Sequence, residues 1–283
     1  MTEFFQALGD PAVPFLRYAL IAGLLASVAF GIVGSYVVTR RITYIAAAIA
    51  HCVLGGLGAA LYLQNNHGLA WCRPMLGAVL SALLAAVVIG LVSLYARQRE
   101  DTVIGAVWAI GMAVGLFFLH KTTPRVDAMS YLFGNINLVT AADLWLVAGL
   151  DVLVVGLGLL FHNKLVAVCF DEEFAGLRGV RVKLHYLLLL CLTALTVVLL
   201  VRVVGIVMVI ALVTLPAAVA GHFARRLWQM MLMATVLCML LITAGLAISY
   251  PADLPSGPTI ILLAGAVYLA VALGNRLWRG RAA

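Results

Sequence analysis

Long apolar stretches, separated by short polar breaks, follow one another along this chain. Each is close to the roughly 20 residues that an α-helix needs to cross a bilayer, whereas strands of a membrane barrel alternate over about ten residues. The stretches cover Phe15–Val38, Ile42–Leu63, Pro74–Ala96, Val103–Leu119, Leu144–Phe161, Tyr186–Val201, Gly205–Gly221, Trp228–Tyr250 and Thr259–Leu277. The pattern predicts an all-α, polytopic membrane protein with about nine transmembrane helices.

The least certain part of this count is the apolar run Tyr186–Gly221. As one helix its 36 residues would be about 54 Å long, too long for one crossing and short for two. The charged Arg202 and the flexible Gly205 indicate a turn inside the run. We therefore expect a full span plus a short or broken span, with an eight-span protein as the alternative.

Composition supports a membrane protein. Hydrophobic residues make up 65% of the chain and charged residues 10%, and the mean hydropathy is +1.14. Soluble domains average about 45–50% apolar and about 25% charged residues. So few polar side chains cannot cover a solvated surface, and no linker or low-complexity tract interrupts the pattern. The sequence predicts a single transmembrane domain over residues 1–283.

The formal net charge of +7 is unevenly distributed between alternate loops. Thirteen basic residues fall on one side: Arg40, Arg41, Arg97, Arg99, Lys164, Arg178, Arg181, Lys183, Arg225, Arg226, Arg276, Arg279 and Arg281. Four fall on the other: Arg17, Arg73, Lys121 and Arg125. Loops rich in Lys and Arg remain in the cytoplasm. This predicts an extracytoplasmic N-terminus and a cytoplasmic C-terminus, and it argues against nucleic-acid binding.

One polar segment, Phe170–Lys183, stands between two apolar runs on the basic side. Asp171 is a suitable N-cap, the acidic residues after it suit a helix N-terminus, and Gly179 is a suitable stop. The segment is predicted to form a short helix along the cytoplasmic membrane surface. An ordinary well-capped loop helix is one interpretation, and a contact site for a cytoplasmic partner is the other.

Four stretches of the chain carry a resemblance to a known family. They are RRITYIAAAIAHCVLGGLG, DTVIGAVWAIGMAVG, YLFGNINLVTAADL, and FDEEFAGLRGV followed by VVLLVRVVGIVMVIALVTLPAAVA. In this order they resemble the second span, the fourth span, an outer segment and the cytoplasmic helix of the membrane subunit of zinc/manganese/iron ABC importers. The match extends over most of residues 40–221.

The resemblance implies an ABC transporter permease of the cell (inner) membrane that is not itself an enzyme. It implies a homodimer, two separate ABC ATPase subunits, an extracytoplasmic metal-binding protein and a lipid bilayer as partners. It implies a transported divalent metal ion and no permanently bound cofactor. The cytoplasmic segment would be the coupling helix that contacts the ATPase, through Phe170, Asp171, Glu172, Glu173, Phe174, Gly176 and Gly179. No GxxxxGK[ST] motif occurs in the chain, so ATP binding of that type is expected on another subunit.

His51 lies near the middle of its apolar run, where an ionisable side chain is costly and indicates function. Neutral imidazole binds Zn²⁺ and Fe²⁺ well. The alternative is a histidine hydrogen-bonded to a neighbouring helix. The family has its functional histidine at this position, with an aspartate four residues earlier, which is Ala47 here. The family's serine is Ala50 here and its proline is Gly55.

Without that carboxylate, metal ligation by this span would depend on His51, with Cys52 as a weaker candidate. Neighbouring residues lie about 100° apart around a helix, which argues against joint ligation by one chain. A two-fold dimer would instead bring two His51 side chains to one ion. This softer ligand set favours zinc, before manganese or iron.

Asp151 and Arg202 are the other charged residues inside apolar runs. They could form an ion pair or line a polar path. Two alternatives to a metal importer remain at this stage. One is an ABC permease for a siderophore or cobalamin, and the other is an ATP-independent secondary metal transporter, which usually shows inverted repeats and several intramembrane carboxylates.

Overall fold

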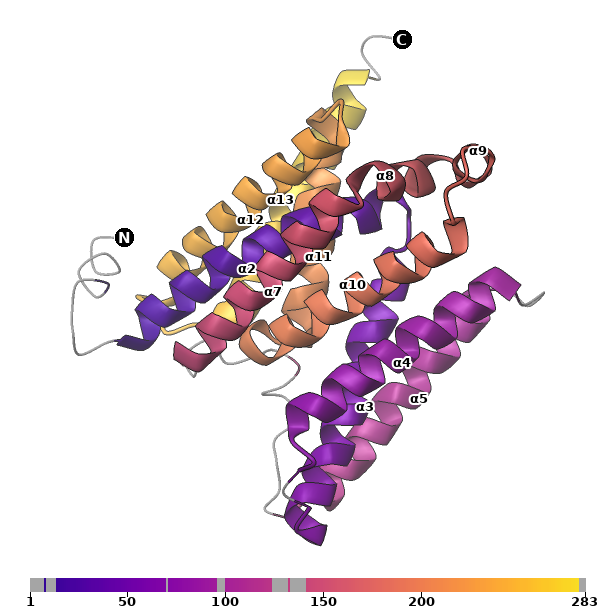
Figure 1. Cartoon of the computed structure of the whole chain (residues 1–283). Helices are drawn as coiled ribbons and strands as arrows, with labels where there is room; N and C mark the ends of the chain where they lie inside the picture. Colours follow the sequence, from indigo (N-terminus) through magenta and orange to yellow (C-terminus); the bar gives the residue numbers. More distant parts are fainter. Residues whose placement is uncertain are drawn as a thin grey trace.

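The computed structural model describes residues 14–69, 71–95, 100–123 and 141–279, together with Leu8 and Leu132. This part of the chain is helical, without strands (Figure 1). The helices are α2 (Pro14–Thr39), α3 (Thr43–His67), α4 (Pro74–Tyr95), α5 (Glu100–Lys121), α7 (Ala141–Leu160), α8 (His162–Phe170), α9 (Glu172–Leu177), α10 (Val182–Val204), α11 (Ile206–Phe223), α12 (Leu227–Ser249) and α13 (Ser256–Arg279). The predicted all-α membrane fold is confirmed, and each of the nine predicted segments corresponds to one helix.

The number of complete spans is close to eight. Among the described residues, seven helices are long and apolar enough to cross a membrane, and the bent pair α7–α8 makes an eighth. Helix α10 counts only as a shorter apolar helix, over Val182–Val198. It ends at Val204, and Gly205 follows with φ 86° before α11 begins. A positive φ favours glycine, so the predicted turn at this residue is confirmed.

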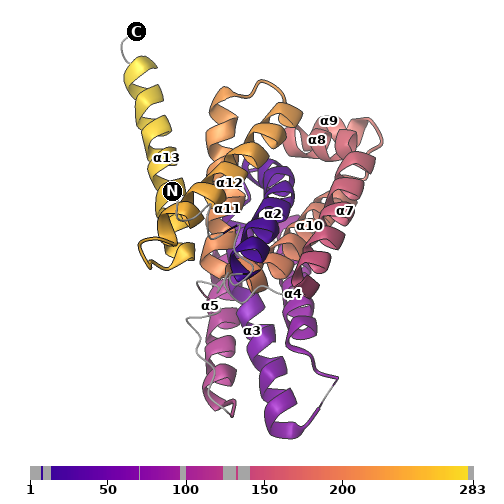
Figure 2. The ribbon, with the colours of Figure 1, turned by 90° about the vertical axis from the view of Figure 1, so that its left-hand side faces the viewer.

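Helix α8 was not predicted. It continues from α7 after a bend of 73° and is partly polar, so it does not extend the apolar pattern of α7. It lies with α9 across one end of the bundle in both ribbon views (Figures 1 and 2). The same end holds the turn between α11 and α12 and the last turns of α13, and the turn between α3 and α4 lies at the opposite end.

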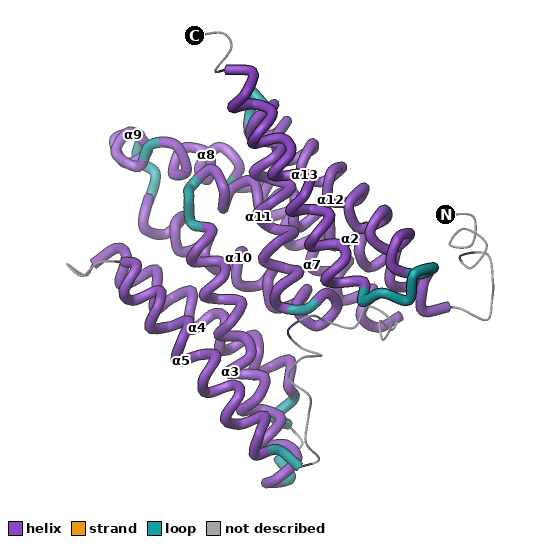
Figure 3. Tube along the Cα trace, turned by 180° about the vertical axis from the view of Figure 1, so that it is seen from behind, coloured by secondary structure: helices purple, strands orange, loops and turns teal. Residues whose placement is uncertain are grey.

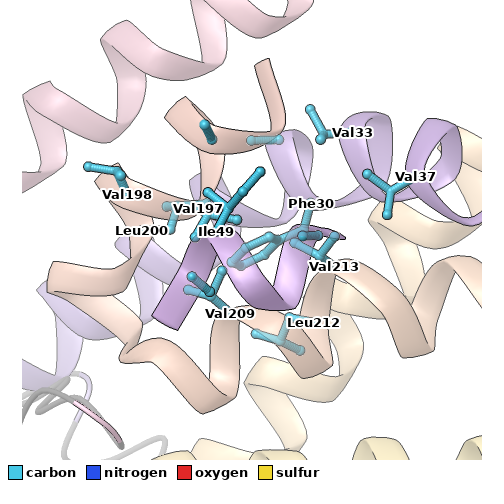
Figure 4. Close-up of a cluster of buried hydrophobic side chains, with 14 of the residues drawn as sticks. Phe30, Val33, Val37, Ile49, Val197, Val198, Leu200, Val209, Leu212 and Val213 are labelled. Atoms are coloured by element: carbon cyan, nitrogen blue, oxygen red, sulfur yellow. The ribbon is translucent and has the colours of Figure 1, made fainter. Parts of the chain in front are cut away.

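The helices form two groups. Helices α3, α4 and α5 pack together and project from the rest of the bundle in Figures 1 and 3, while α2 is surrounded by α7, α11 and α12. Helix α10 packs against both groups. The core between them contains Phe30 from α2, Ile49 from α3, Val197 from α10 and Val209 from α11, all buried (Figure 4). Helix α3 is thus anchored in the core near the residue of interest, His51.

Glycines bring α3 and α5 into close contact. A Cβ atom built on Gly58 would lie 2.6 Å from the carbonyl oxygen of Gly115, and one built on Gly115 would lie 2.6 Å from the carbonyl carbon of Leu54. No side chain fits at such distances. Membrane helices pack through van der Waals contact, which small residues extend, because lipid is as apolar as the helix surface. The glycine-rich segments are therefore packing elements.

Candidate functional site

Helix α9 is a short, strongly capped helix. The Asp171 carboxylate accepts a hydrogen bond from the backbone N–H of Phe174 at 2.9 Å, and Glu172 and Glu173 occupy the first turn. At the other end Gly179 has φ 77°, and the Val180 amide donates to the carbonyl of Ala175 at 3.0 Å. The predicted N-cap and glycine stop are confirmed. They hold six residues in a helix that would otherwise be too short to be stable.

Large apolar side chains are exposed at the end of α8 and along α9. Phe170 is 68% exposed, Phe174 50% and Leu177 88%, whereas Ala175 is buried against the body of the protein. Charged residues lie beside them: the Arg178 guanidinium is 4.9 Å from the ring centroid of Phe174, and Glu172 and Glu173 are in the first turn of α9. An exposed apolar cluster with a polar rim is typical of a protein contact surface.

The two glycines of this segment differ in their surroundings. A Cβ on Gly176 would meet only the Val182 side chain, at an ordinary 3.9 Å, so a larger residue fits the chain itself. Gly179 has open space around it, but its positive φ disfavours any other residue. Gly176 therefore leaves room for a partner, and Gly179 shapes the turn into α10.

His51 is half-buried on α3 and its ring is held by two contacts. Its Nδ1 is 2.9 Å from the carbonyl oxygen of Ala47, which only accepts hydrogen bonds, so Nδ1 carries the proton. The imidazole also stacks on the indole of Trp108 in α5, with 4.4 Å between ring centroids and 35° between planes. The second nitrogen, Nε2, makes no hydrogen bond within the described part of the chain. It is a free acceptor with the lone pair that a metal needs.

The hydrogen bond of His51 is a property of helical histidines in this protein. His185 bonds the carbonyl of Arg181 at 2.9 Å and His222 that of Ala218 at 2.8 Å. His51 differs from His185 in its aromatic contact: the His51 ring lies at 35° to the Trp108 indole, whereas His185 meets the Phe161 ring edge-on at 5.7 Å. Tyr44 lies beside the same indole, with 5.6 Å between ring centroids and 51° between planes. Sequence reasoning missed Trp108, because nothing in the pattern shows which face of α5 meets α3.

Cys52, like His51, contacts α5, but through a different residue. Its thiol lies 3.1 Å from the carbonyl oxygen of Val107, to which it donates, and it is buried against α5. Within the described residues, no group of three or more His, Cys, Asp or Glu side chains could hold a metal ion. One copy of the described chain therefore offers a single imidazole at this position.

Comparisons with known proteins add the family. The model of the family described as "ABC 3 transport family" matches residues 12–275. The chain belongs to the ABC 3 transport family. It is 39% identical over 251 residues to the "Probable metal transport system membrane protein" of Chlamydia pneumoniae, covering 88% of this chain and 85% of that one. It is 31% identical to the "Manganese import system permease protein ScaB" of Streptococcus parasanguinis, covering 95% and 93%.

A solved structure has the same fold as this permease. In the structure titled "PsaBC from Streptococcus pneumoniae in complex with Fab", one chain is 28% identical with a TM-score of 0.83. The alignment covers 95% of this chain and 94% of that chain. The resemblance predicted from the four sequence stretches is therefore confirmed over nearly the full length: the chain is an ABC permease and a membrane protein.

The acidic residue of α7 is buried. Asp151 is 8% exposed, and its two carboxylate oxygens find no hydrogen-bond partner among the described residues. The side chain of Arg202 lies outside the described residues, so their ion pair stays a prediction. A carboxylate in this position is costly unless it is paired or protonated.

The same substitution at Gly176 and at Gly179 tests whether the two glycines have different structural roles. Gly176→Ala is expected to leave the segment intact, because its surroundings are open and alanine is the better helix former. Gly179→Ala is expected to destabilise the end of α9 by about 1 kcal/mol, because its φ is positive. Hydrogen exchange of residues 172–180 measures this. Equal exchange in the two variants would contradict the glycine stop.

Proposed function

We propose that this permease forms the membrane channel of an ATP-driven importer of divalent transition metal ions. The family membership and the names of the relatives support this reading over a secondary transporter, and over a permease for a siderophore or cobalamin. The observation that carries it is the exposed apolar surface where α8 meets α9, formed by Phe170 at the end of α8 and by Phe174 and Leu177 in α9, in a chain without a P-loop motif. ATP hydrolysis is therefore assigned to a separate ABC ATPase.

In this proposal the ATPase binds α9 through Phe170, Asp171, Glu172, Glu173, Phe174, Gly176 and Gly179. Closure of two ATPases on ATP moves the two α9 helices of a permease dimer. A metal-loaded extracytoplasmic protein docks at the opposite end and releases its ion into the closed path. The ion then enters the cytoplasm when the path closes to the outside and opens to the inside.

His51 is proposed to meet the ion on the way. Its Nε2 is unpaired within the described chain, its ring plane is held by Trp108, and one chain supplies too few ligands. A two-fold homodimer would supply a second imidazole. The imidazole, with Ala47 in place of a carboxylate, favours zinc, whereas the names of several relatives contain manganese. Zinc and manganese are therefore the two metals that the uptake measurement has to compare.

The proposed orientation places α9 and the C-terminus in the cytoplasm and the N-terminus outside. Helix α9, the turn between α11 and α12 and the last turns of α13 lie at one end of the molecule, in agreement with the basic loops (Figures 1 and 2). Reporter fusions after Arg41, Asn66, Arg99 and Arg279 are expected to read in, out, in and in. An outside signal at Arg279 would contradict this orientation.

Uptake of zinc, manganese and iron by a deletion strain carrying the permease tests the function. His51→Ala and His51→Gln are expected to abolish uptake of the transported metal, because neither residue supplies a nitrogen lone pair. His222→Gln is the matched control, since His222 makes the same backbone bond on an exposed cytoplasmic-side turn. Normal uptake by His51→Gln, at normal membrane levels, would show that the histidine is structural.

Ala47→Asp is the reverse variant, and it restores a carboxylate one turn from His51. It is expected to shift preference toward manganese, because carboxylates suit Mn²⁺ better than imidazole does. The measurement is the ratio of manganese to zinc uptake in the same strain. An unchanged ratio would mean that this face of α3 does not meet the ion.

Gly176→Trp tests the ATPase contact. A Cβ atom at Gly176 meets only ordinary contact, so membrane levels are expected to stay normal, while ATPase co-purification and uptake are lost. Gly265→Trp is the control, because a Cβ atom at Gly265 also has nothing within 4 Å, and its helix α13 packs against α11 and α12. Normal co-purification and uptake with Gly176→Trp would remove the assignment of α9.

A further inference from the structure

Tyr36 in α2 and Arg40, which directly follows α2, contact the first residue of α8 and the first residue of α9. The Tyr36 hydroxyl lies 3.0 Å from Nδ1 of His162, the first residue of α8. The Arg40 guanidinium donates to the Glu172 carboxylate, at the first residue of α9. These partners are 126 and 132 residues apart along the chain. The end of α2 is therefore attached to the segment that carries the exposed apolar face.

The two contacts come from neighbouring positions on one side of α2. Tyr36 and Arg40 are four residues apart, on one face of a helix. Arg40 follows the last residue of α2, but its amide still donates to the carbonyl of Tyr36 at 2.9 Å, so the helical geometry continues to it. Motion of α8–α9 relative to the bundle has to move this end of α2 or break one of the two contacts.

Arg40 also contacts the helix that follows α9. Its guanidinium lies over the ring of Tyr186 in α10, 5.6 Å from the centroid, and the buried Tyr186 hydroxyl lies 3.3 Å from the Ser93 hydroxyl in α4. The Arg40 side chain is 28% exposed and the Glu172 side chain 36%. An ion pair as exposed as this one adds little to the free energy of unfolding, about 0–1 kcal/mol. It is the one ion pair in the part of the chain that the structure describes. Its location matters more than its strength.

The turn after Arg40 passes directly into α3. Arg41 has φ 62°, the amide of the buried Ile42 donates to the carbonyl of Val37 at 3.0 Å, and α3 begins at Thr43. Because this turn is short and hydrogen-bonded, a displacement of Arg40 is expected to displace the start of α3 as well. His51 follows eight residues into α3, about 12 Å along the helix at 1.5 Å per residue.

We propose that Arg40 is a positioning residue that transmits the movement of α9 to α3. Through its ion pair with Glu172 it displaces the α2–α3 turn, and with it the helix that carries His51. This inference rests on the proposed function, in which an ATPase moves α9. The competing route is covalent, from α9 through residues 178–181 into α10, and it does not need Arg40.

A charge exchange separates the two routes. Arg40→Glu and Glu172→Arg are made singly and together, with Arg225→Glu as the matched control, because Arg225 is an exposed arginine between α11 and α12 without an ion pair among the described residues. Each variant is purified with its ATPase and reconstituted in vesicles. Metal uptake, ATP hydrolysis and ATPase co-purification are measured on the same preparation.

Arg40→Glu is expected to keep the ATPase bound and hydrolysing, and to lower the metal moved per ATP by about tenfold, within the range of coupling between contacting residues. The double variant is expected to recover most of that loss in metal moved per ATP, and Arg225→Glu to behave as the wild type. A wild-type ratio in Arg40→Glu would overturn the inference. So would loss of ATPase binding in Arg40→Glu, or no recovery of the ratio in the double variant.

A second measurement does not depend on metal transport. Hydrogen exchange of residues 40–46 is compared with and without ATP in the wild-type complex and in Arg40→Gln. ATP is expected to change this exchange in the wild type and to leave it unchanged in Arg40→Gln, while exchange of α9 responds in both. An equal response of residues 40–46 in both proteins overturns the linkage. Absence of metal uptake by the wild type would instead contradict the proposed function.

Discussion

A bilayer offers no hydrogen-bond partner to a peptide group, and the architecture of this permease follows from that constraint. Every span is a helix, which bonds its own backbone. The few polar side chains inside the helices mostly bond backward in the same way. The hydroxyls of Ser27, Ser35 and Thr193 donate to carbonyls four residues earlier, at 2.7–2.8 Å. Polar atoms that remain unpaired in such surroundings, as at His51 and Asp151, are therefore the informative ones.

The same constraint changes what holds the helices together. Apolar side chains gain little by moving from lipid to protein, so close packing has to supply the attraction. Gly58 and Gly115 allow α3 and α5 to approach to backbone contact, and these helices with α4 form one group beside the α2-centred bundle. A group packed in this way moves as a unit. A force applied at the start of α3 would then move His51 and its Trp108 support together.

Outside the hydrocarbon region, by contrast, hydrogen bonds and an ion pair position the segments. Asp171 and Gly179 hold six residues as a helix, which presents Phe174 and Leu177 outward. Arg40 and Glu172 join this helix to the turn before α3. In the proposed movement the two features have different roles. The apolar side chains bind the ATPase, and the ion pair transmits the displacement of α9 to α3.

Much of this protein could be predicted from the sequence because the deciding interactions are local. The positions of the nine helices follow from runs of apolar residues, the cap of α9 from Asp171, and the break after α10 from Gly205. The family follows from short motifs in order. Each of these depends on residues within a few positions of one another, where the backbone conformation is set by hydrogen bonds and side-chain shape.

What only the tertiary structure decided depends on residues far apart in the chain. The 73° bend between α7 and α8, the stacking of Trp108 on His51, and the bond of Arg40 to Glu172 have no local signal. The spans are apolar on nearly all sides, so the pattern does not distinguish a face toward lipid from one toward another helix. Which residues meet is determined by packing of the whole bundle, and packing is a property of all the helices at once.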